Sequence, residues 1–229
     1  MKVFLCGGGS GKIVADAMRK FESLLDKSKP LLYVPLAMES SRYDSCLAWI
    51  TNEMSLINVK NIEMVTSGND LFSKKLDDYC AIFIGGGNTY KLLKDLKNSK
   101  SFDKIKNFIN NDGIVFGGSA GAIIFGKDIN SCRMQDKNDV GLKDTKGFNI
   151  IKDYSLLCHL NRNDGIKFNR NKNSDYLLDF SKENKTIFLP DDDTIFVTDN
   201  EIKIIGNSDY EVYKNRKCEI VINDKKKQT

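Results

Sequence analysis

The feature that most constrains the fold of this chain is an apolar run that ends in Gly-Gly-Ser-Ala-Gly at residues 117–121. β-Branched and aromatic residues precede the glycines and small apolar residues follow at helical spacing, which predicts a strand, a tight turn and a helix. The pattern G-x-S-x-G is typical of a nucleophile elbow, in which flanking glycines permit a sharp bend and the serine stands at its apex. The alternative interpretation of Ser119 is a helix cap in a glycine-rich loop.

A second glycine-rich turn, Gly85-Gly86-Gly87, follows an apolar segment at residues 81–84. We expect open main-chain N–H groups there, at the start of a helix, where they can hold a developing negative charge. Asn88 or Thr89 would cap that helix, and we also count Asn88 as a candidate substrate-binding residue.

Apolar segments alternate with amphipathic ones over the first half of the chain. Strands are expected at 3–6, 31–36, 62–65, 81–84 and immediately before the elbow, with helices between them. This alternation predicts an α/β fold, with a mainly parallel sheet covered by helices on both faces. In such a sheet the active crevice lies outside the carboxyl ends of the strands, where both glycine-rich turns fall. Short strands between residues 194 and 222 predict a C-terminal β meander, and we interpret residues 1–229 as a single domain.

Composition and charge limit the partners and the cellular location that we expect for the chain. It has 229 residues and a formal net charge of +4, part of which is the run Lys225-Lys226-Lys227. Such a run is usually a solvated tail, so we expect no nucleic-acid partner. No apolar run approaches a membrane span, and the six cysteines occur singly, as expected of free thiols in a cytoplasmic protein. These features leave the oligomeric state open.

A serine hydroxyl needs a base within hydrogen-bond reach to act as a nucleophile at neutral pH. His159 is the only histidine in the chain, and it follows an apolar segment that reads as a strand. An acid must then hold the imidazole tautomer, and the candidates are Asp139 and Asp191, or one of the neighbours of Asp191. The oxyanion donors would be the N–H of Ala120 and one N–H from the Gly85–Gly87 turn. No metal or organic cofactor is required by this chemistry.

Residues 7–12, GGGSGK, superficially resemble a phosphate-binding loop. However, the spacing of the glycines and the Lys-Ser/Thr ending of that motif are both absent. We therefore interpret this segment as a strand-to-helix turn that binds no nucleotide.

The two motifs GGGNTYKLL (residues 85–93) and GGSAGAI (residues 117–123), in this order and spacing, resemble the serine peptidase family of dipeptidase E. This is the family of aspartyl dipeptidases, related to the cyanophycinases. Weaker matches continue through Asn138-Asp139, residues 143–148, His159 and Leu189-Pro190-Asp191. The resemblance implies a three-layer α/β/α sandwich like that of class I glutamine amidotransferases, and hydrolysis of dipeptides with N-terminal aspartate as substrates, without a metal.

The resemblance also implies roles for particular residues. Ser119 matches the nucleophile and His159 the base. Gly87 and Ala120 match the oxyanion donors. Asp139 matches the residue proposed as the third member of the catalytic triad, and Asp191 lies where the family often has a glutamate. Arg170 lies where the family has an arginine that would pair with the aspartyl carboxylate of the substrate.

The chain departs from the family beside the base. The family commonly has Pro-His followed by an aromatic residue, whereas here the sequence is Cys158-His159-Leu160. This difference bears on substrate preference more than on hydrolysis. The main hypothesis is a serine peptidase that acts on short peptides. The alternatives are an esterase on a similar elbow and a non-catalytic sensor domain with an amidotransferase-like fold.

Overall fold

The computed structural model describes residues 1–162 and 168–223, and the lysine run at 225–227 lies outside the described residues. The strands are β1 Lys2–Cys6, β2 Leu31–Val34, β3 Ile62–Met64, β4 Ala81–Ile84, β5 Ile114–Gly118, β6 Ser155–Leu157, β7 Thr186–Phe188, β8 Thr194–Thr198, β9 Ile202–Ile205, β10 Tyr210–Lys214 and β11 Lys217–Val221. The helices are α1 Ala15–Glu22, α2 Tyr43–Ser55, α3 Gly68–Ser73, α4 Thr89–Asn98, α5 Ser101–Asn110, α6 Ala120–Ile123 and α7 Arg170–Phe180.

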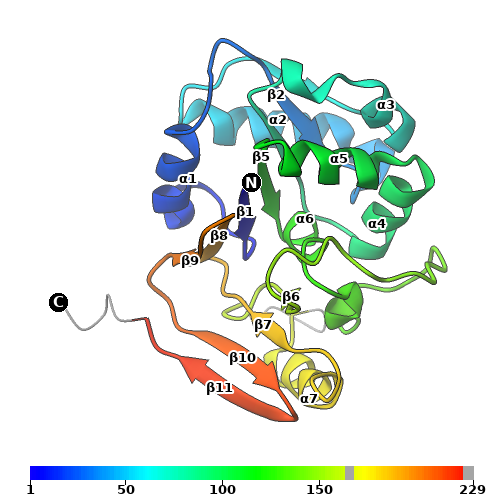
Figure 1. Ribbon diagram of the computed structural model, residues 1–229, viewed down its shortest axis with the longest axis vertical. Coiled ribbons are helices and arrows are strands. Elements are labelled where there is room, and N and C mark those ends of the chain that lie inside the picture. The colour runs from blue at the N-terminus through cyan, green and yellow to red at the C-terminus, as the bar shows by residue number, and fades with distance from the viewer. Residues whose placement is uncertain (163–167, 224–229) are drawn as a thin grey trace.

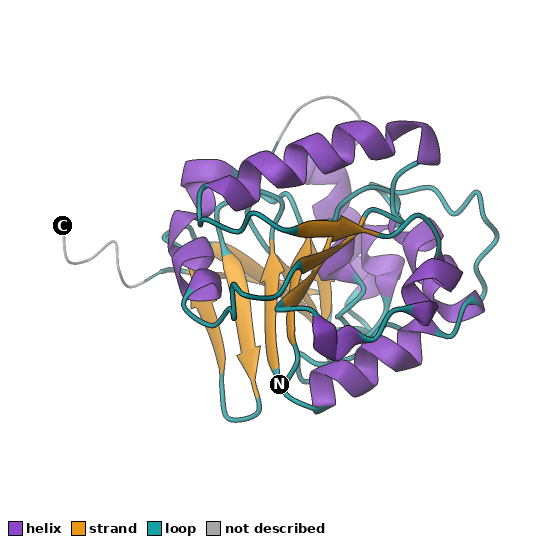
Figure 2. Ribbon diagram, turned by 90° about the horizontal axis from the view of Figure 1, so that it is seen from above, coloured by secondary structure: helices purple, strands orange, loops and turns teal. Residues whose placement is uncertain are grey.

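A seven-stranded sheet in the order β3-β2-β4-β5-β1-β8-β9 forms the centre of the molecule (Figure 1). The five strands from β3 to β1 run parallel, and β8 joins β1 antiparallel. Helices cover both faces of this sheet (Figure 2). The predicted α/β sandwich with a mainly parallel sheet is confirmed.

Side-chain alternation along the strands explains the two helical layers. In β1, Val3 and Leu5 belong to the core under α3, α4 and α5, whereas Phe4 and Cys6 belong to the core under α1 and α2. Because successive side chains of a strand point to opposite faces, a strand that is apolar throughout must be covered on both sides. All four residues are at most 1% exposed, so the two cores are separated by the sheet alone.

The C-terminal strands are distributed over two sheets. The hairpin β8–β9 extends the main sheet, while β10–β11 joins β7 and β6 in a second, four-stranded sheet in the order β11-β10-β7-β6 (Figure 1). The strands expected as one meander are therefore present as two hairpins. The physical reason is burial: β8 is almost wholly buried beside β1, whereas the edge strand β11 is mostly exposed.

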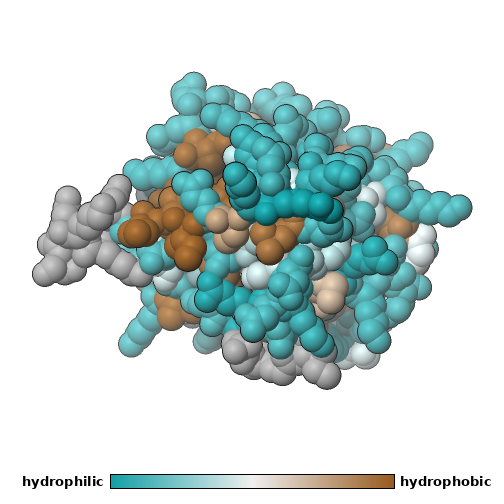
Figure 3. Space-filling model, turned by 90° about the horizontal axis from the view of Figure 1, so that it is seen from below, coloured by the Kyte–Doolittle hydropathy of each residue, from teal (hydrophilic) through white to brown (hydrophobic). Residues whose placement is uncertain are grey.

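The end of the molecule formed by the second sheet is mainly hydrophilic, with a group of apolar side chains to one side (Figure 3). Ile220 of β11 and Ile222 after it are both 59% exposed. Across residues 1–162 and 168–223, no helix has the length and apolar character that crossing a bilayer requires.

The sequence pattern predicts a short helix over residues 174–180, and helix α7 begins earlier than that segment. The side chain of Asn169 accepts a hydrogen bond from the Lys172 N–H and caps the helix, so that it starts at Arg170. The apolar pattern begins later than the cap, which explains why the pattern alone places the start too late.

Candidate active site

The turn from β5 into α6 has the sharp backbone bend expected of a nucleophile elbow. Ser119 lies between them with φ 53° and ψ −114°, a backbone conformation that is unfavourable for a residue with a Cβ. The bend brings the strand and helix so close that a Cβ on Gly117 would lie 2.2 Å from the carbonyl oxygen of Gly121. Ser119 is held by its own N–H, which donates to the Cys6 carbonyl at 3.1 Å. A Cβ on Gly121 would likewise lie 2.1 Å from the Ile84 carbonyl oxygen, so the packing of the turn requires both glycines, and the serine lies at its apex.

Three side chains from distant segments form one hydrogen-bonded line. Ser119 Oγ lies 2.8 Å from His159 Nε2, and His159 Nδ1 lies 2.6 Å from Asp191 Oδ1. A carboxylate accepts only, so Nδ1 carries a proton and Nε2 is left free to accept the serine proton. His159 is 6% exposed, so bulk water has little access to the imidazole. The arrangement is that of a Ser-His-Asp triad.

Asp139 is not part of this line. It is exposed on the loop after the elbow, whereas the Nδ1 side of the imidazole is occupied by Asp191 from the segment after β7. The geometry therefore favours Asp191 over Asp139 as the acid, between the two candidates that the sequence leaves open.

The glycine-rich loop after β1 packs against His159 and Asp191 and is hydrogen-bonded to the backbone of both. The His159 N–H donates to the Gly7 carbonyl at 3.2 Å, and the Gly9 N–H donates to the Asp191 carbonyl at 2.8 Å. Between them, a Cβ on Gly8 would lie 2.1 Å from His159 Cε1 and 2.5 Å from Nδ1. The loop touches the proposed base and acid directly, a role that its glycine pattern does not reveal in the sequence.

Replacing Gly8 by alanine is expected to lower kcat/KM at least about 100-fold, because the new methyl group displaces the imidazole from its position between Ser119 and Asp191. Gly11→Ala is the matched control. Gly11 lies in the same loop with φ +60°, yet a Cβ there meets no atom within 4 Å. The control bears backbone strain of about 1 kcal/mol but no clash with the triad. Equal activity of the two variants would contradict this role of Gly8, and circular dichroism would verify that both fold.

The two predicted oxyanion donors, Ala120 and Gly87, lie in the two glycine-rich turns. Ala120 is the first residue of α6, so its N–H has no partner within the helix. Gly87 has φ +140° and packs so closely on Ala37 that a Cβ would lie 2.4 Å from the Ala37 carbonyl oxygen. On the next residue, the Asn88 N–H donates to the same oxygen at 2.8 Å, which holds this turn in place. A Cβ on Gly86 would lie 3.1 Å from the Cβ of Ser119, so the two glycine-rich turns lie together, as expected.

Asn88 and Arg170 are engaged elsewhere. The Asn88 side chain caps α4 by accepting from the Lys91 N–H at 2.9 Å, and it donates to the Lys137 carbonyl at 2.8 Å. Arg170, at the start of α7, forms an ion pair with buried Glu211 on β10. Glu211 also accepts a hydrogen bond from the Tyr213 hydroxyl at 2.6 Å. Both predicted substrate-binding residues therefore have structural partners, and neither lines the cavity at Ser119.

The two cysteines beside Ser119 are less suited than its hydroxyl to act as a nucleophile. Cys6 and Cys158 are buried, and the Cys158 thiol lies 3.8 Å from the Ser119 carbonyl oxygen. Burial raises the pKa of both thiols, so they remain neutral and weakly nucleophilic.

A cavity of about 510 Å³ opens at Ser119. Ser119, His159, Gly86 and Gly87 line one part of it. The other groups of interest in its lining are two guanidinium groups, an indole and two polar side chains of the loop after the elbow: Arg42, Arg162, Trp49, Gln135 and Asp136. This volume suits a short peptide or another small ligand.

A sequence model of Peptidase family S51 matches residues 3–205 of the chain. The chain belongs to peptidase family S51. The resemblance read from the two glycine motifs is thereby confirmed.

Relatives of this S51 chain include peptidases from several bacteria. Peptidase E of Haemophilus influenzae Rd is 34% identical over 103 residues, which cover 45% of this chain and 46% of that protein. The chain thus matches about half the length of the Haemophilus relative. An uncharacterized peptidase of Listeria monocytogenes is 29% identical over 157 residues, which cover 66% of this chain and 75% of that one.

Solved structures agree with the fold. The crystal structure of a candidate peptidase E from Listeria monocytogenes superimposes with a TM-score of 0.69 at 25% identity, covering 90% of this chain and 98% of that one. A peptidase from an acI-B1 actinobacterium gives a TM-score of 0.72 at 18% identity, covering 96% and 93% of the two chains. The second likeness concerns the fold alone.

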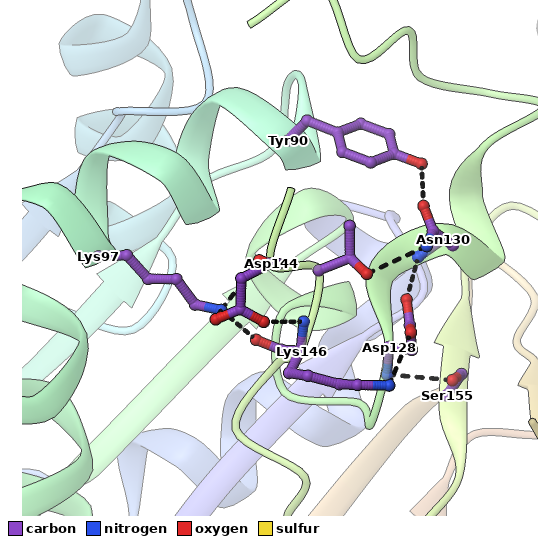
Figure 4. Close-up of polar contacts among 8 residues, drawn as sticks. Tyr90, Lys97, Asp128, Asn130, Asp144, Lys146 and Ser155 are labelled. Atoms are coloured by element: carbon purple, nitrogen blue, oxygen red, sulfur yellow. Dashed lines mark hydrogen bonds and ion pairs between the residues drawn. The ribbon is translucent and has the colours of Figure 1, made fainter. Parts of the chain in front are cut away.

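In the S51 chain the loop after the elbow is fastened to α4 by a polar network (Figure 4). Asn130 accepts from the Tyr90 hydroxyl at 3.0 Å, and Lys97 pairs with Asp144 at 2.6 Å. Within the loop, Asp128 accepts from the Asn130 N–H at 2.9 Å and forms an ion pair with Lys146. The loop is therefore an ordered wall of the cavity, to which it contributes Gln135 and Asp136.

Several cavity residues of the S51 chain are not singled out by the sequence. Trp49 is expected to pack against the sheet, and it does contact Phe83, but it is also 39% exposed and lines the cavity. Its spacing from Arg42 along α2 is a usable signal, since residues seven apart share a helix face. Arg162 is close to His159 in sequence, but nothing in the pattern separates it from Arg170.

Proposed function

We propose that the chain is a serine peptidase that hydrolyses short peptides through an acyl-enzyme on Ser119. The single observation that carries this proposal is the line from Ser119 through His159 to Asp191, at 2.8 Å and 2.6 Å. Membership of family S51 supports the same activity.

In the acylation step, His159 Nε2 accepts the Ser119 proton while Oγ forms a bond to the carbonyl carbon of the peptide. The carbonyl oxygen becomes an oxyanion, which the N–H groups of Gly87 and Ala120 would stabilise by about 3 kcal/mol each. The imidazolium, stabilised by Asp191, then gives its proton to the leaving nitrogen as the C–N bond breaks.

In the deacylation step, water takes the place of the released amine. His159 accepts a proton from the water as its oxygen attacks the ester carbonyl. When the C–O bond to Ser119 breaks, the proton passes back to Oγ and the free acid leaves. Ser119 and His159 thus end the cycle in their starting protonation states, and the residues of the chain are sufficient for both steps.

Dipeptides with N-terminal aspartate are the proposed substrates, in a cytoplasmic setting. Arg162 lines the cavity at Ser119, three residues after His159 in the chain, whereas Arg170 is not among the residues that line it. The Arg162 guanidinium lies 4.3 Å from the centre of the Phe168 ring, which orients the planar group. We therefore assign the aspartyl carboxylate to Arg162, since a guanidinium can hold a carboxylate with two hydrogen bonds.

Hydrolysis of Asp-Ala, Asn-Ala and Ala-Ala tests the substrate class, and we expect Asp-Ala to be cleaved fastest. Arg162→Gln should raise KM for Asp-Ala roughly 10–100-fold, the range of a lost hydrogen bond to a charged group. Arg170→Gln is the matched control, with an unchanged KM. A rise in KM with Arg170→Gln alone would return the role to that residue.

The two alternative functions give different results. An esterase would cleave p-nitrophenyl esters while leaving all three dipeptides intact. A non-catalytic sensor would not react with a fluorophosphonate probe, because an unactivated serine does not attack phosphorus. Either result would remove the peptidase proposal.

A further inference from the structure

One face of α2, together with the residue that precedes the helix, borders the cavity at Ser119. Arg42, Ser45, Cys46 and Trp49 all line the cavity, at spacings of three, four and seven residues. This is the spacing of side chains on one side of a helix. The cavity at Ser119 thus has a wall whose chemistry comes from a single rigid element.

Trp49 offers this wall a large apolar surface. It is 39% exposed, although Phe83 and Tyr33 behind it are 4% and 2% exposed. The Trp49 ring packs edge-on against Phe83 with centroids 5.9 Å apart and is tilted against Tyr33 at 6.5 Å. One side of the indole is therefore held by the two buried rings, and its other side is exposed to the cavity. A ligand that covers it gains apolar burial at little cost in side-chain ordering.

Arg42 offers the same wall a positive charge. It lies immediately before the first residue of α2 and lines the cavity. Among residues 1–162 and 168–223, no carboxylate forms an ion pair with it. An arginine in that situation is suited to a carboxylate of a ligand.

We propose that this face of α2 binds the second residue of the dipeptide, with Trp49 against its side chain and Arg42 on its free carboxylate. The proposal rests on the proposed function, because the aspartyl side chain is already assigned to Arg162. The side chain and carboxylate of the second residue are then the groups left to bind. Arg42 and Trp49 are roughly 10 Å apart along the helix axis, a span that a large residue and the arginine side chain cover together. The enzyme accordingly favours Asp-Xaa with a large apolar Xaa and a free C-terminus.

The first test concerns the side chain of the second residue. The wild-type enzyme should cleave Asp-Phe with a kcat/KM at least about tenfold above that for Asp-Ala, the scale of selectivity that apolar pockets provide. Trp49→Ala should reduce this ratio to near one. Phe72→Ala, which removes a 46% exposed aromatic ring on α3 outside the cavity, should preserve it. A wild-type ratio near one, or a ratio unchanged by Trp49→Ala, would overturn the assignment of Trp49.

The second test concerns the carboxylate. The wild-type enzyme should prefer Asp-Phe to Asp-Phe-amide by about tenfold or more in kcat/KM, through KM. Arg42→Gln should abolish the preference, and Arg42→Lys should restore part of it. Arg19→Gln removes an exposed arginine of α1 that does not line this cavity and should leave the preference as it is. Persistence of the preference in Arg42→Gln would assign the carboxylate to another group.

Binding to the Ser119→Ala variant separates this inference from the proposed function. Trp49 is the only tryptophan of the chain, so its fluorescence reports directly on ligands that reach it. Asp-Phe should change the emission and bind more tightly than Asp-Ala by calorimetry. If the wild-type enzyme cleaved neither peptide while this difference remained, the peptidase proposal would fall and the binding face would stand. Equal binding of the two peptides together with normal cleavage would overturn the binding face and leave the peptidase proposal standing.

Discussion

Ser119→Ala is expected to lower kcat for Asp-Ala by about 10⁴-fold or more, the loss seen when a triad serine is removed from a serine hydrolase. Alanine keeps the Cβ of serine, so the backbone at φ 53° is no more strained than before. Within the described part of the chain, the hydroxyl contact that is lost is the 2.8 Å hydrogen bond to His159. The melting temperature should therefore stay within a few degrees of the wild type. Steady-state kinetics and thermal denaturation followed by circular dichroism measure the two quantities.

Ser10→Ala is the matched control for this change. Ser10 lines the same cavity but is not hydrogen-bonded to the triad. A fluorophosphonate should label the wild type and Ser10→Ala, and fail to label Ser119→Ala. Full turnover in the Ser119→Ala variant would mean that another group attacks the peptide.

Asp191→Asn is expected to lower kcat by about 10³–10⁴-fold. The asparagine amide can donate to Nδ1, which favours the tautomer with its proton on Nε2. That nitrogen would then face the Ser119 hydroxyl as a donor and could not accept the serine proton. Folding should be retained, because the substitution keeps the size of the side chain that accepts from Nδ1 at 2.6 Å.

Asp139→Asn is the paired comparison, and its kcat should lie within about twofold of the wild type, as for most exposed substitutions away from a site. The two aspartates differ in position only, so the pair tests the geometry rather than the residue type. A greater loss in Asp139→Asn than in Asp191→Asn would assign the acid to the loop after the elbow.

The fold was largely predictable because its signal is local. Apolar strands alternate with amphipathic helices, and the strand residues 3–6 and 81–84 are recovered to within one residue at each end. The pairing of the C-terminal strands is not local. The pairing of β8 with β1 joins segments that lie far apart in the sequence, and no turn motif specifies it.

The sequence singles out a candidate site residue where a residue type or motif has a single representative. His159 is the only imidazole, and Ser119 occupies a motif whose backbone requires glycines on either side. Aspartates and arginines are numerous, so Asp139 and Asp191, or Arg162 and Arg170, compete on nearly equal terms in the sequence. Only the three-dimensional arrangement separates them. Gly8 was missed for a related reason: its function is the space it leaves empty for His159.

The proposed nucleophile and its proposed base follow strands of different sheets. Ser119 ends a strand of the main sheet, whereas His159 and Asp191 follow two strands of the smaller one, and at the junction a Cβ on Gly7 would lie 1.9 Å from the Pro190 carbonyl oxygen. The distance between Ser119 Oγ and His159 Nε2, and with it the rate of proton transfer, therefore depends on how the two sheets pack against each other. A change at this junction that moved His159 away from Ser119 by a fraction of an ångström would slow turnover, although every residue of the triad would still be present.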